Sequence, residues 1–276
     1  MVPVEQLTAK LRLAEATISR LDGVVVALSG GVDSSLLLAL ATRALGTDRV
    51  LAVTALGAVE SEEDVESARA VARQLQVTHR VIMLDSLEVP GFAENTPSRC
   101  YLCRQQLYSA LERIRRENGF GAVLDGAIAD DAQDYRPGLR AAKEAGVLHP
   151  LAEAGLSKDE VREASRHLGL PTSERPASPC LASRFPYGEE ITLEALQTVA
   201  RAESVLHAWG FPIVRVRHRR QLACIEVPAD EVSRLCEEPL RSQITAALND
   251  LGYTYVCADL RGFRSGSLNE VLQSHR

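Results

Sequence analysis

Short apolar runs alternate with amphipathic helical segments through the first 170 residues, and this alternation constrains the fold more than any other feature. Apolar residues at three- and four-residue steps between Val4 and Leu21 predict an opening helix. Strands are predicted at Val24 to Leu28, Arg49 to Leu56, His79 to Leu84 and Ala122 to Leu124. Helices are predicted at residues 36–45, 61–75 and 157–168. Such alternation predicts an α/β fold, a Rossmann-like parallel sheet with helices on both faces.

The loops after the strands are where such sheets bind ligands, because the carboxyl ends of parallel strands meet at one edge. Here these loops are residues 29–35, 85–103 and 125–138. Residues 171–190 contain four prolines without periodicity, which predicts a linker or active-site loop. A helix at 192–209, two strands, a helical stretch at 230–251 and a strand at 253–258 follow. We therefore expect a nucleotide-binding domain over 1–170 and a small α+β domain over 191–276.

Composition narrows the classes of partner. The 276 residues carry 31 Lys+Arg against 37 Asp+Glu, a net charge of −6, and only 4% are aromatic. This balance argues against nucleic acid as a partner. No run of about 18 apolar residues predicts a membrane span, and no export signal is recognised. Six cysteines in such a chain indicate a cytoplasmic protein whose thiols are free, metal-bound or catalytic.

The loop from Ser29 to Ser35 reads Ser-Gly-Gly-Val-Asp-Ser-Ser and joins a predicted strand to a helix. Gly30 and Gly31 let the backbone approach an anion closely, and helix N–H groups together with the Ser34 and Ser35 hydroxyls can bind it. Asp33 is too negative to face phosphate, so we assign it to a magnesium ion. The Walker A lysine is missing, which favours a grip on departing pyrophosphate. The alternative is an ordinary capped turn.

The cysteines divide into two sets. Cys100 and Cys103 form a C-x-x-C pair at a helix entrance, a position expected to lower a thiol pKa, and Cys180 lies in the proline-rich loop. One such pair is too few for a closed zinc site, whereas three thiolates suit a [4Fe–4S] cluster with one open iron. The alternative is that the pair only packs at the helix start. The remaining cysteines follow apolar patterns and are expected in the core: Cys224, Cys236 and Cys257.

Two charged clusters complete the candidate residues. Asp125, Asp130, Asp131 and Asp134 crowd one loop beside Arg136, where they either meet a cation or a hydroxyl donor or are simply solvated. In the stretch from Ile213, alternation places three side chains on one face: Arg215, Arg217 and Arg219. Stacked arginines favour a phosphate between them, although a solvent-facing edge strand is the alternative.

Together these motifs resemble a known family. SGGVDSS is similar to the signature of the PP-loop ATP pyrophosphatases, and with RCYLC, DYRPG, PASPCLASR, VRVRH and GFRSGSLNEVL the chain resembles the LarE family from about residue 5 to 272. The resemblance implies an ATP-dependent sulfur transferase of nickel-pincer cofactor biosynthesis. It adenylates a carboxylate of a pyridinium dicarboxylate mononucleotide and replaces it with a thiocarboxylate, releasing AMP and pyrophosphate. It also implies a homo-oligomer.

The resemblance assigns roles residue by residue. ATP and Mg²⁺ are expected at Ser29, Gly30, Gly31, Asp33, Ser34, Ser35, Asp125 and Gly126. The sulfur is expected on a cluster held by Cys100, Cys103 and Cys180, or else it comes from Cys180 itself, with Ser183 and Arg184 nearby. The substrate is expected at Arg215, Arg217, Asp130, Asp131 and Arg136. The family's usual Thr-Asn after Gly126 is replaced here by Ala127 and Ile128.

The same residues leave three rival functions open. A tRNA thiolase would need a broad basic surface, and an amidating synthetase would need an ammonia source. A nucleotide-binding cluster sensor would bind ATP without releasing pyrophosphate.

Overall fold

The computed structural model describes residues 4–133, 137–176, 178–264 and 266–270, and the chain folds into two compact units. The first unit comprises Met1–Val89 and Ser98–Ser178, and the second comprises Pro90–Pro97 and Pro179–Arg276. Within the described ranges no helix is long and apolar enough to cross a membrane.

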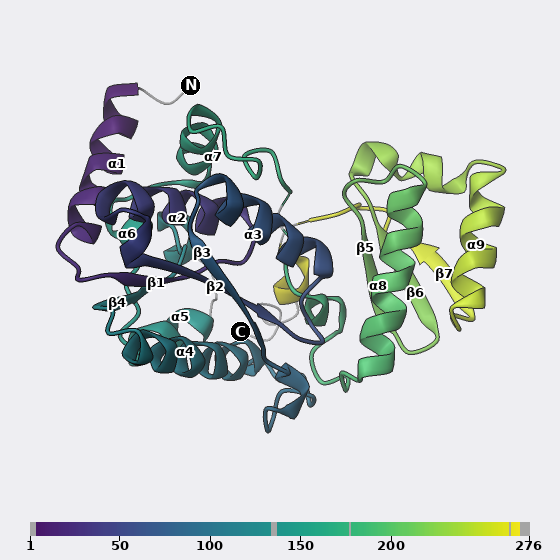
Figure 1. Ribbon diagram of the computed structural model, residues 1–276. Helices are drawn as coiled ribbons and strands as arrows, with labels where there is room; N and C mark the ends of the chain where they lie inside the picture. Colours follow the sequence, from purple (N-terminus) through teal and green to yellow (C-terminus); the bar gives the residue numbers. More distant parts are fainter. Residues whose placement is uncertain (1–3, 134–136, 177, 265, 271–276) are drawn as a thin grey trace. The chain divides into compact units, whose positions relative to one another are not determined.

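The first unit is built on a parallel four-stranded sheet with strand order β3-β2-β1-β4 (Figure 1). Its strands are β1 (Val24–Ala27), β2 (Val50–Leu56), β3 (Thr78–Met83) and β4 (Ala122–Leu124). Every neighbouring pair is parallel, with Val24 opposite both Val50 and Ala122. The predicted Rossmann-like parallel sheet is therefore confirmed.

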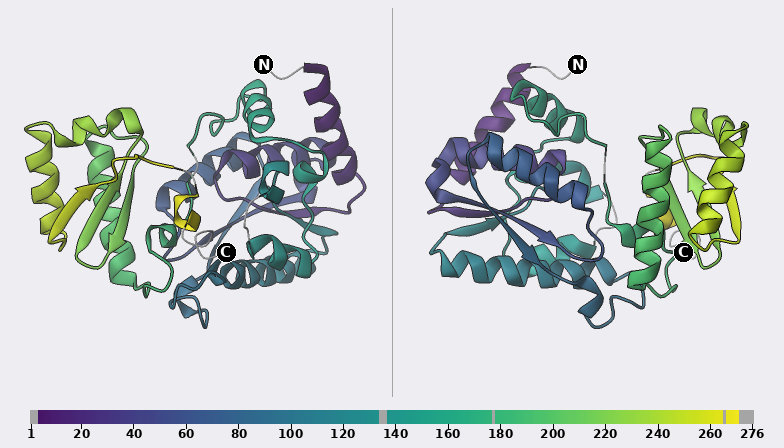
Figure 2. Two further views of the ribbon diagram at one scale, coloured as in Figure 1. Left: turned by 180° about the vertical axis from the view of Figure 1, so that it is seen from behind. Right: turned by 45° about the vertical axis from the view of Figure 1, so that its right-hand side comes forward.

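Helices cover both faces of this sheet because its strands are apolar on both sides (Figures 1 and 2). Val24, Val26 and Ala52 pack into one core, whereas Val25, Leu51 and Val53 pack into another. The first core is closed by α1 (Val4–Ile18), α2 (Val32–Leu45), α3 (Glu62–Gln74), α6 (Pro150–Glu153) and α7 (Lys158–His167). The second is closed by α4 (Arg99–Glu117) and α5 (Pro137–Glu144).

Two helices begin where their caps predict. The Ser61 hydroxyl accepts a hydrogen bond from the Asp64 N–H and caps α3. Ser157 and Glu160 form a capping box at the start of α7, in which the side chain of each accepts a hydrogen bond from the backbone N–H of the other.

The second unit has a three-stranded sheet with strand order β5-β6-β7. β5 (Arg215–Arg219) is antiparallel to β6 (Leu222–Glu226), which is parallel to β7 (Tyr255–Ala258). One face packs against α8 (Leu193–Ala208) and α9 (Leu240–Asp250), burying Val214, Val216, Ala223 and Ile225.

The long helix expected over residues 230–251 is wrong in its first half. That stretch contains two 3₁₀ turns, η5 (Ala229–Glu231) and η6 (Ser233–Cys236), and α9 begins only after Pro239. Proline lacks an N–H and clashes with the preceding turn, so it is found at the start of this helix rather than in its interior.

A segment of the expected ligand loop 85–103 belongs to the second unit. Asn95, which is fully buried and has a φ of 52°, donates from Nδ2 to the carbonyl of Pro186 at 2.6 Å. Its own carbonyl accepts from the Gly188 N–H at 3.0 Å. Residues 90–97 are thereby held against the chain just beyond Cys180, a connection that the sequence analysis did not predict.

Candidate functional site

The phosphate loop is a tight turn between β1 and α2. The Ser34 hydroxyl lies within hydrogen-bonding distance of the Ser29 N–H (3.2 Å) and the Ser29 hydroxyl (3.1 Å), and Ser35 donates to the Gly31 carbonyl at 2.7 Å. Gly31 is the N-cap residue of α2 and, as a glycine, has no side chain to cap the helix. The first N–H groups of α2 therefore remain available to an anion at this end of the helix.

Gly30 must be glycine for two reasons. Its φ is +77°, and a Cβ there would lie 2.2 Å from the backbone oxygen of Asp64. Its carbonyl accepts from Ser67 Oγ at 2.9 Å and from Arg175 Nη1 at 2.8 Å. Because a trans peptide points its C=O and N–H in opposite directions, these two donors fix the Gly31 N–H on the other side of the loop.

Arg175 ties the phosphate loop to the segment that precedes Cys180. Besides the Gly30 carbonyl, its guanidinium pairs with Asp64 at 2.9 Å. Asp64 also accepts from Ser61 at 2.7 Å and from Ser178 at 3.3 Å. The loop, the start of α3, Arg175 and Ser178 are thus held by one polar network.

Asp33 faces a lysine that the sequence analysis did not single out. Lys158 Nζ donates to both carboxylate oxygens of Asp33, at 2.9 and 2.8 Å. The Lys158 backbone N–H donates to Asp130 at 2.8 Å. The structure therefore places the first turn of α7, Asp33 and Asp130 at one point beside the phosphate loop.

The other residues expected in the acidic loop have protein partners as well. Gly126 lies against the start of α2, since a Cβ there would be 2.8 Å from the Ser34 nitrogen. Asp125 accepts from Tyr108 at 2.7 Å and from Arg104 at 3.2 Å. Asp131 is buried and accepts from the Ile128 N–H at 3.1 Å, so it is not a solvated acid. Asp134 and Arg136 lie outside the described residues.

Ala127 and Ile128 are buried and line a hollow of about 330 Å³ together with Asp131, Lys143 and His149. The replacement of the family's Thr-Asn thus gives this hollow an apolar wall.

Cys100 and Cys103 lie in the first two turns of α4, and burial raises the pKa of the Cys103 thiol above its ordinary value. The expectation that the helix entrance lowers this pKa is wrong for Cys103, because the loss of solvent outweighs the hydrogen bond to Ser86 (3.4 Å) and the charge of Arg104. A neighbouring carboxyl, Glu60, is itself largely buried, and burial raises its pKa from 4.5 to about 7. Sequence reasoning missed Glu60, since nothing in its local pattern indicates burial.

In the second unit, Arg184 holds the backbone around Cys180. Arg184 Nη1 donates to the carbonyls of Pro179 at 2.5 Å and Cys180 at 3.0 Å, and to the Ser183 hydroxyl at 3.2 Å. Its other nitrogens form a two-point pair with Glu203, at 2.9 and 2.7 Å. The Cys180 side chain is exposed beside this buried clamp.

Arg217 extends this cluster to the small sheet. It pairs with both oxygens of Glu226, at 2.9 and 2.8 Å, and donates to the Ser183 carbonyl at 2.7 Å and to Ser267 Oγ at 2.8 Å. Glu203 also accepts from the Val216 N–H at 2.8 Å. Ser183, Arg184 and Arg217 are therefore brought together with the backbone of Cys180.

The charges in this cluster do not balance. The cluster contains three arginines, Arg184, Arg215 and Arg217, and two glutamates, Glu203 and Glu226, so its formal net charge is 3 − 2 = +1. Burial, together with the like charges of Arg184 and Arg217, lowers the pKa of Arg215 to about 10. An anion would relieve this crowding. Arg219, by contrast, is exposed at the edge of the sheet.

Three cysteines expected in the core are not there. Cys236 and Cys257 are exposed, and Cys224 is only partly buried. Cys224 and Cys257 project from the strands on the side opposite the helices, because their neighbours Ala223, Ile225 and Val256 already face the core.

Cys100 and Cys103 lie in the first unit and Cys180 in the second. Over the described parts of the chain, no group of three or more His, Cys, Asp or Glu side chains is arranged as a metal site. A cluster held by these three cysteines stays a prediction.

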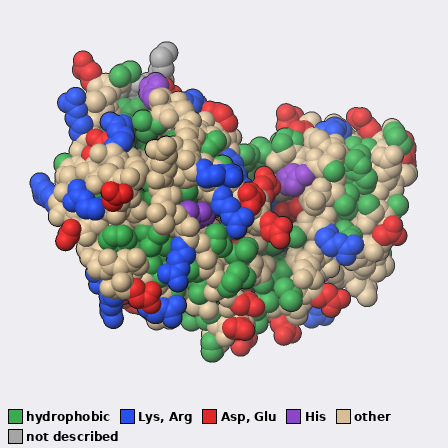
Figure 3. All heavy atoms as spheres, in the orientation of Figure 1, with side chains coloured by type: hydrophobic (Ala, Val, Ile, Leu, Met, Phe, Trp, Pro, Cys, Tyr) green, Lys and Arg blue, Asp and Glu red, His purple; other side chains and the backbone are tan. Residues whose placement is uncertain are grey.

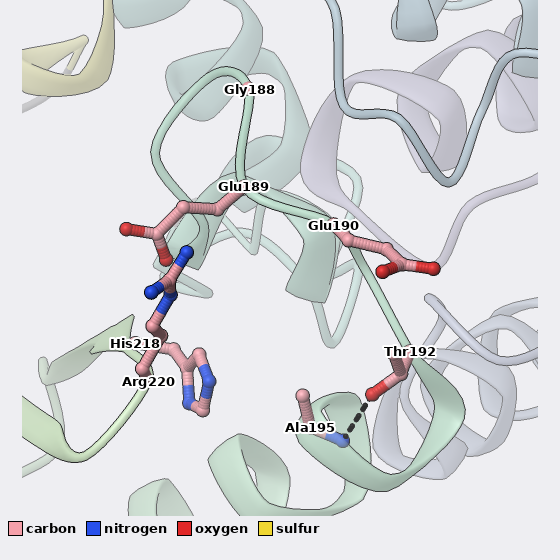
Figure 4. A pocket seen from close by; sticks show the side chains of 7 residues that line it. All are labelled: Gly188, Glu189, Glu190, Thr192, Ala195, His218 and Arg220. Atoms are coloured by element: carbon pink, nitrogen blue, oxygen red, sulfur yellow. Dashed lines mark hydrogen bonds between the residues drawn. The ribbon is translucent and has the colours of Figure 1, made fainter.

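The second unit also contains a hollow of about 380 Å³ between the segment at Gly188–Thr192 and the end of β5 (Figure 4). The Glu189 carboxylate and the Arg220 guanidinium point toward each other there, while Glu190 points away. None of the site residues expected from the sequence lines it. Over the face shown in Figure 3, acidic and basic side chains are interspersed.

Comparison with known proteins places this geometry in a family. A family model described as NAD synthase matches residues 4–98, which include the phosphate loop. The pyridinium-3,5-bisthiocarboxylic acid mononucleotide synthase of Lactiplantibacillus plantarum is 39% identical over 96% of this chain and 96% of its own length.

Two further relatives carry no functional name. An uncharacterized protein of Synechocystis sp. is 41% identical over 96% of this chain and 99% of its own. An uncharacterized protein of Methanocaldococcus jannaschii is 30% identical over 88% and 91%. The chain belongs to the LarE family of ATP-dependent PP-loop enzymes.

Proposed function

We propose that this chain adenylates a carboxylate of a pyridinium dicarboxylate mononucleotide and converts it to a thiocarboxylate, as a step in making a nickel-pincer cofactor. The observation that carries the proposal is its similarity, over nearly the whole of both chains, to a synthase named for the bisthiocarboxylic acid product. The phosphate loop and the positively charged cluster around Arg215 supply the two anion sites that such a reaction needs.

Adenylation needs the ATP phosphates to be held while the α-phosphorus is attacked. The N–H groups at the start of α2 and the Ser34 hydroxyl bind the departing pyrophosphate, while Ser35, whose hydroxyl donates to the Gly31 carbonyl at 2.7 Å, holds the loop in shape. The donor chemistry at Asp33 fits magnesium, which as a hard cation prefers carboxylate oxygen, and Lys158 supplies a second positive charge at the same carboxylate. When bound, magnesium would neutralise charge on the phosphates.

The substrate is held through its own phosphate. The unbalanced charge of Arg184, Arg215 and Arg217 favours a dianion over a neutral ligand. We assign phosphate binding to Arg215 and Arg217 together. Glu226, Ser183 and Ser267 position Arg217, and Arg215 donates to the Val214 carbonyl at 2.8 Å and lies against the Phe263 ring. We assign a substrate-positioning role to Asp130 and Asp131, which hold the acidic loop in shape.

The sulfur is assigned to a [4Fe–4S] cluster held by Cys100, Cys103 and Cys180. The donor set fits, because three thiols that are not in disulfides match the three ligands of a cluster with one open iron. When bound, the cluster would carry hydrosulfide on that iron. In this step Arg184 holds the Cys180 backbone. Cys103, whose thiol pKa is raised by burial, must give up its proton in order to bind iron.

The alternative source is Cys180 itself. Its sulfur would attack the acyl-adenylate and expel AMP, and cleavage of the Cβ–S bond with loss of the Cα proton would then leave dehydroalanine. Iron content after anaerobic purification, and the mass of the Cys180 peptide after turnover, separate the two routes. Iron with an unchanged peptide supports the cluster, and an iron-free protein that loses the mass of hydrogen sulfide from Cys180 supports sacrifice.

Pyrophosphate release in the presence of the pyridinium substrate tests the proposal as a whole. Release that depends on the substrate supports it. Binding of ATP without any release would instead favour a nucleotide-binding sensor, and release that depends only on tRNA would favour a thiolase of tRNA.

A further inference from the structure

Two cysteines outside the expected sulfur site lie next to each other on the small sheet. Cys224 of β6 and Cys257 of β7 are register partners in a parallel pair. Side chains of paired residues project from the same face, and this face is the one not covered by α8 and α9.

The two thiols are near enough to react with each other. Neighbouring strands are about 4.8 Å apart, within the range of roughly 4.4–6.8 Å between Cα atoms that a disulfide spans. Burial raises the pKa of Cys224 to about 12, and a hydrogen bond with the Cys257 thiol adds to the rise. Cys257 is exposed, so a small reagent reaches it first.

The surroundings connect the pair to the arginine cluster. On the other side of Cys224, the register partner is Arg217 of β5, and Glu226, which holds Arg217, lies two residues further along β6. The row Arg217–Cys224–Cys257 thus crosses all three strands.

We propose that Cys224 and Cys257 form a redox-active dithiol, a modification site that low-molecular-weight disulfides oxidise to an intramolecular disulfide beside the Arg217–Glu226 pair. The site requires no cluster, metal or sulfur donor. It takes a co-reactant of one chemical class, a small disulfide such as oxidised glutathione.

The reaction is a double thiol–disulfide exchange. The Cys257 thiolate attacks one sulfur of the small disulfide, whose S–S bond breaks, and the departing thiolate takes up a proton. The Cys224 sulfur then loses its proton and attacks the Cys257 sulfur of the mixed disulfide, expelling the second small thiol. The protein loses two hydrogen atoms, and the small disulfide is reduced to two thiols.

Cys236 provides a matched control. It is exposed in the same unit, on the 3₁₀ turn η6, and has no cysteine as a strand partner. With the same reagent it should stop at the mixed disulfide.

The experiment treats the full chain with oxidised glutathione, alkylates the remaining thiols and analyses its peptides by mass spectrometry. We expect a linked Cys224–Cys257 peptide, lighter by two hydrogen atoms, in the wild type and in Cys236→Ser. In Cys224→Ser we expect a glutathione adduct on Cys257 instead. Separate adducts on both residues of the wild type, or no reaction at Cys257, would overturn the proposal.

A second readout rests on the proposed function. Substrate-dependent pyrophosphate release should fall on oxidation of the wild type and recover with dithiothreitol, whereas Cys224→Ser/Cys257→Ser should not respond. Unchanged pyrophosphate release from protein in which the Cys224–Cys257 disulfide is complete would overturn the proposed effect on the Arg217–Glu226 pair. If the reduced protein releases none, the proposed function fails while the peptide result stands.

Discussion

The buried pair of Arg184 and Glu203 is the feature that most directly holds the Cys180 backbone, and Glu203→Gln tests it. Both side chains are nearly inaccessible, at 4% and 7% exposure, so solvent screens the pair little. The substitution keeps the shape of the side chain and removes its charge. The cluster of three arginines then faces Glu226 alone, and its formal charge rises from 3 − 2 = +1 to 3 − 1 = +2.

Removing one partner of a buried ion pair costs about 3–5 kcal/mol, and because glutamine still accepts a hydrogen bond we expect the lower end, about 3 kcal/mol. The loss should appear in the second unit. The single tryptophan, Trp209, packs against that unit's core, so its fluorescence during urea unfolding reports the change. Inorganic phosphate should stabilise the variant more than the wild type, since the uncompensated positive charge is larger.

A surface pair in the same unit serves as the control. Glu231 lies 3.2 Å from Arg234, with both side chains partly exposed, and Glu231→Gln should change the free energy of unfolding by less than about 0.5 kcal/mol. Equal losses in the two variants, or a loss below about 1 kcal/mol in Glu203→Gln, would refute the reasoning that the clamp is a buried ionic structure.

Three further outcomes are expected. Gly30→Ala should reduce ATP-dependent pyrophosphate release by at least about tenfold, because the new Cβ would lie 2.2 Å from the Asp64 oxygen, whereas Gly146→Ala, at a similar φ of +68° but with open space around it, should leave release intact. Lys158→Met should raise the KM for ATP in pyrophosphate assays and leave the midpoint of thermal unfolding nearly unchanged. A purely structural lysine would instead lower the unfolding midpoint and leave the KM nearly unchanged. Burial raises the pKa of Glu60 from 4.5 to about 7, so between these pH values the folded state binds more protons than the unfolded state. The free energy of unfolding should therefore fall as pH rises from about 4.5 to about 7. The fall is at most about 3 kcal/mol in urea titrations, and Glu60→Gln should abolish it.

Much of the fold follows from local patterns in the sequence. The apolar run at residues 24–28, the Ser61 cap and the Ser157–Glu160 box each predict an element that the structure contains. These signals succeed because a strand's burial and a helix's first turn are determined by neighbours in the chain.

The failures have a different physical origin. Cys257 lies in an apolar pattern, yet the edge position of β7 and the uncovered face of its sheet leave the side chain exposed. Burial raises the pKa of the Cys103 thiol and outweighs the helix entrance, and two residues that interact with this thiol, Ser86 and Glu60, belong to other segments of the chain. Tertiary packing decides both, and a single sequence does not encode it in a readable pattern.

The site shows the same division. The phosphate loop is recognisable because its contacts are local, with Ser34 and Ser35 returning to residues three to five positions away. Lys158 reaches Asp33 across 125 positions, and Glu203 reaches Arg184 across 19, so no spacing rule predicts either pair.

The most direct test of the account is a single-turnover reaction of anaerobically purified protein with ATP, magnesium and the pyridinium dicarboxylate mononucleotide, followed by mass spectrometry of the small molecules. We predict that AMP and pyrophosphate form together and that one carboxylate oxygen of the substrate is replaced by sulfur. Formation of AMP and pyrophosphate with an amidated product, or an unmodified substrate after ATP is consumed, would contradict the account.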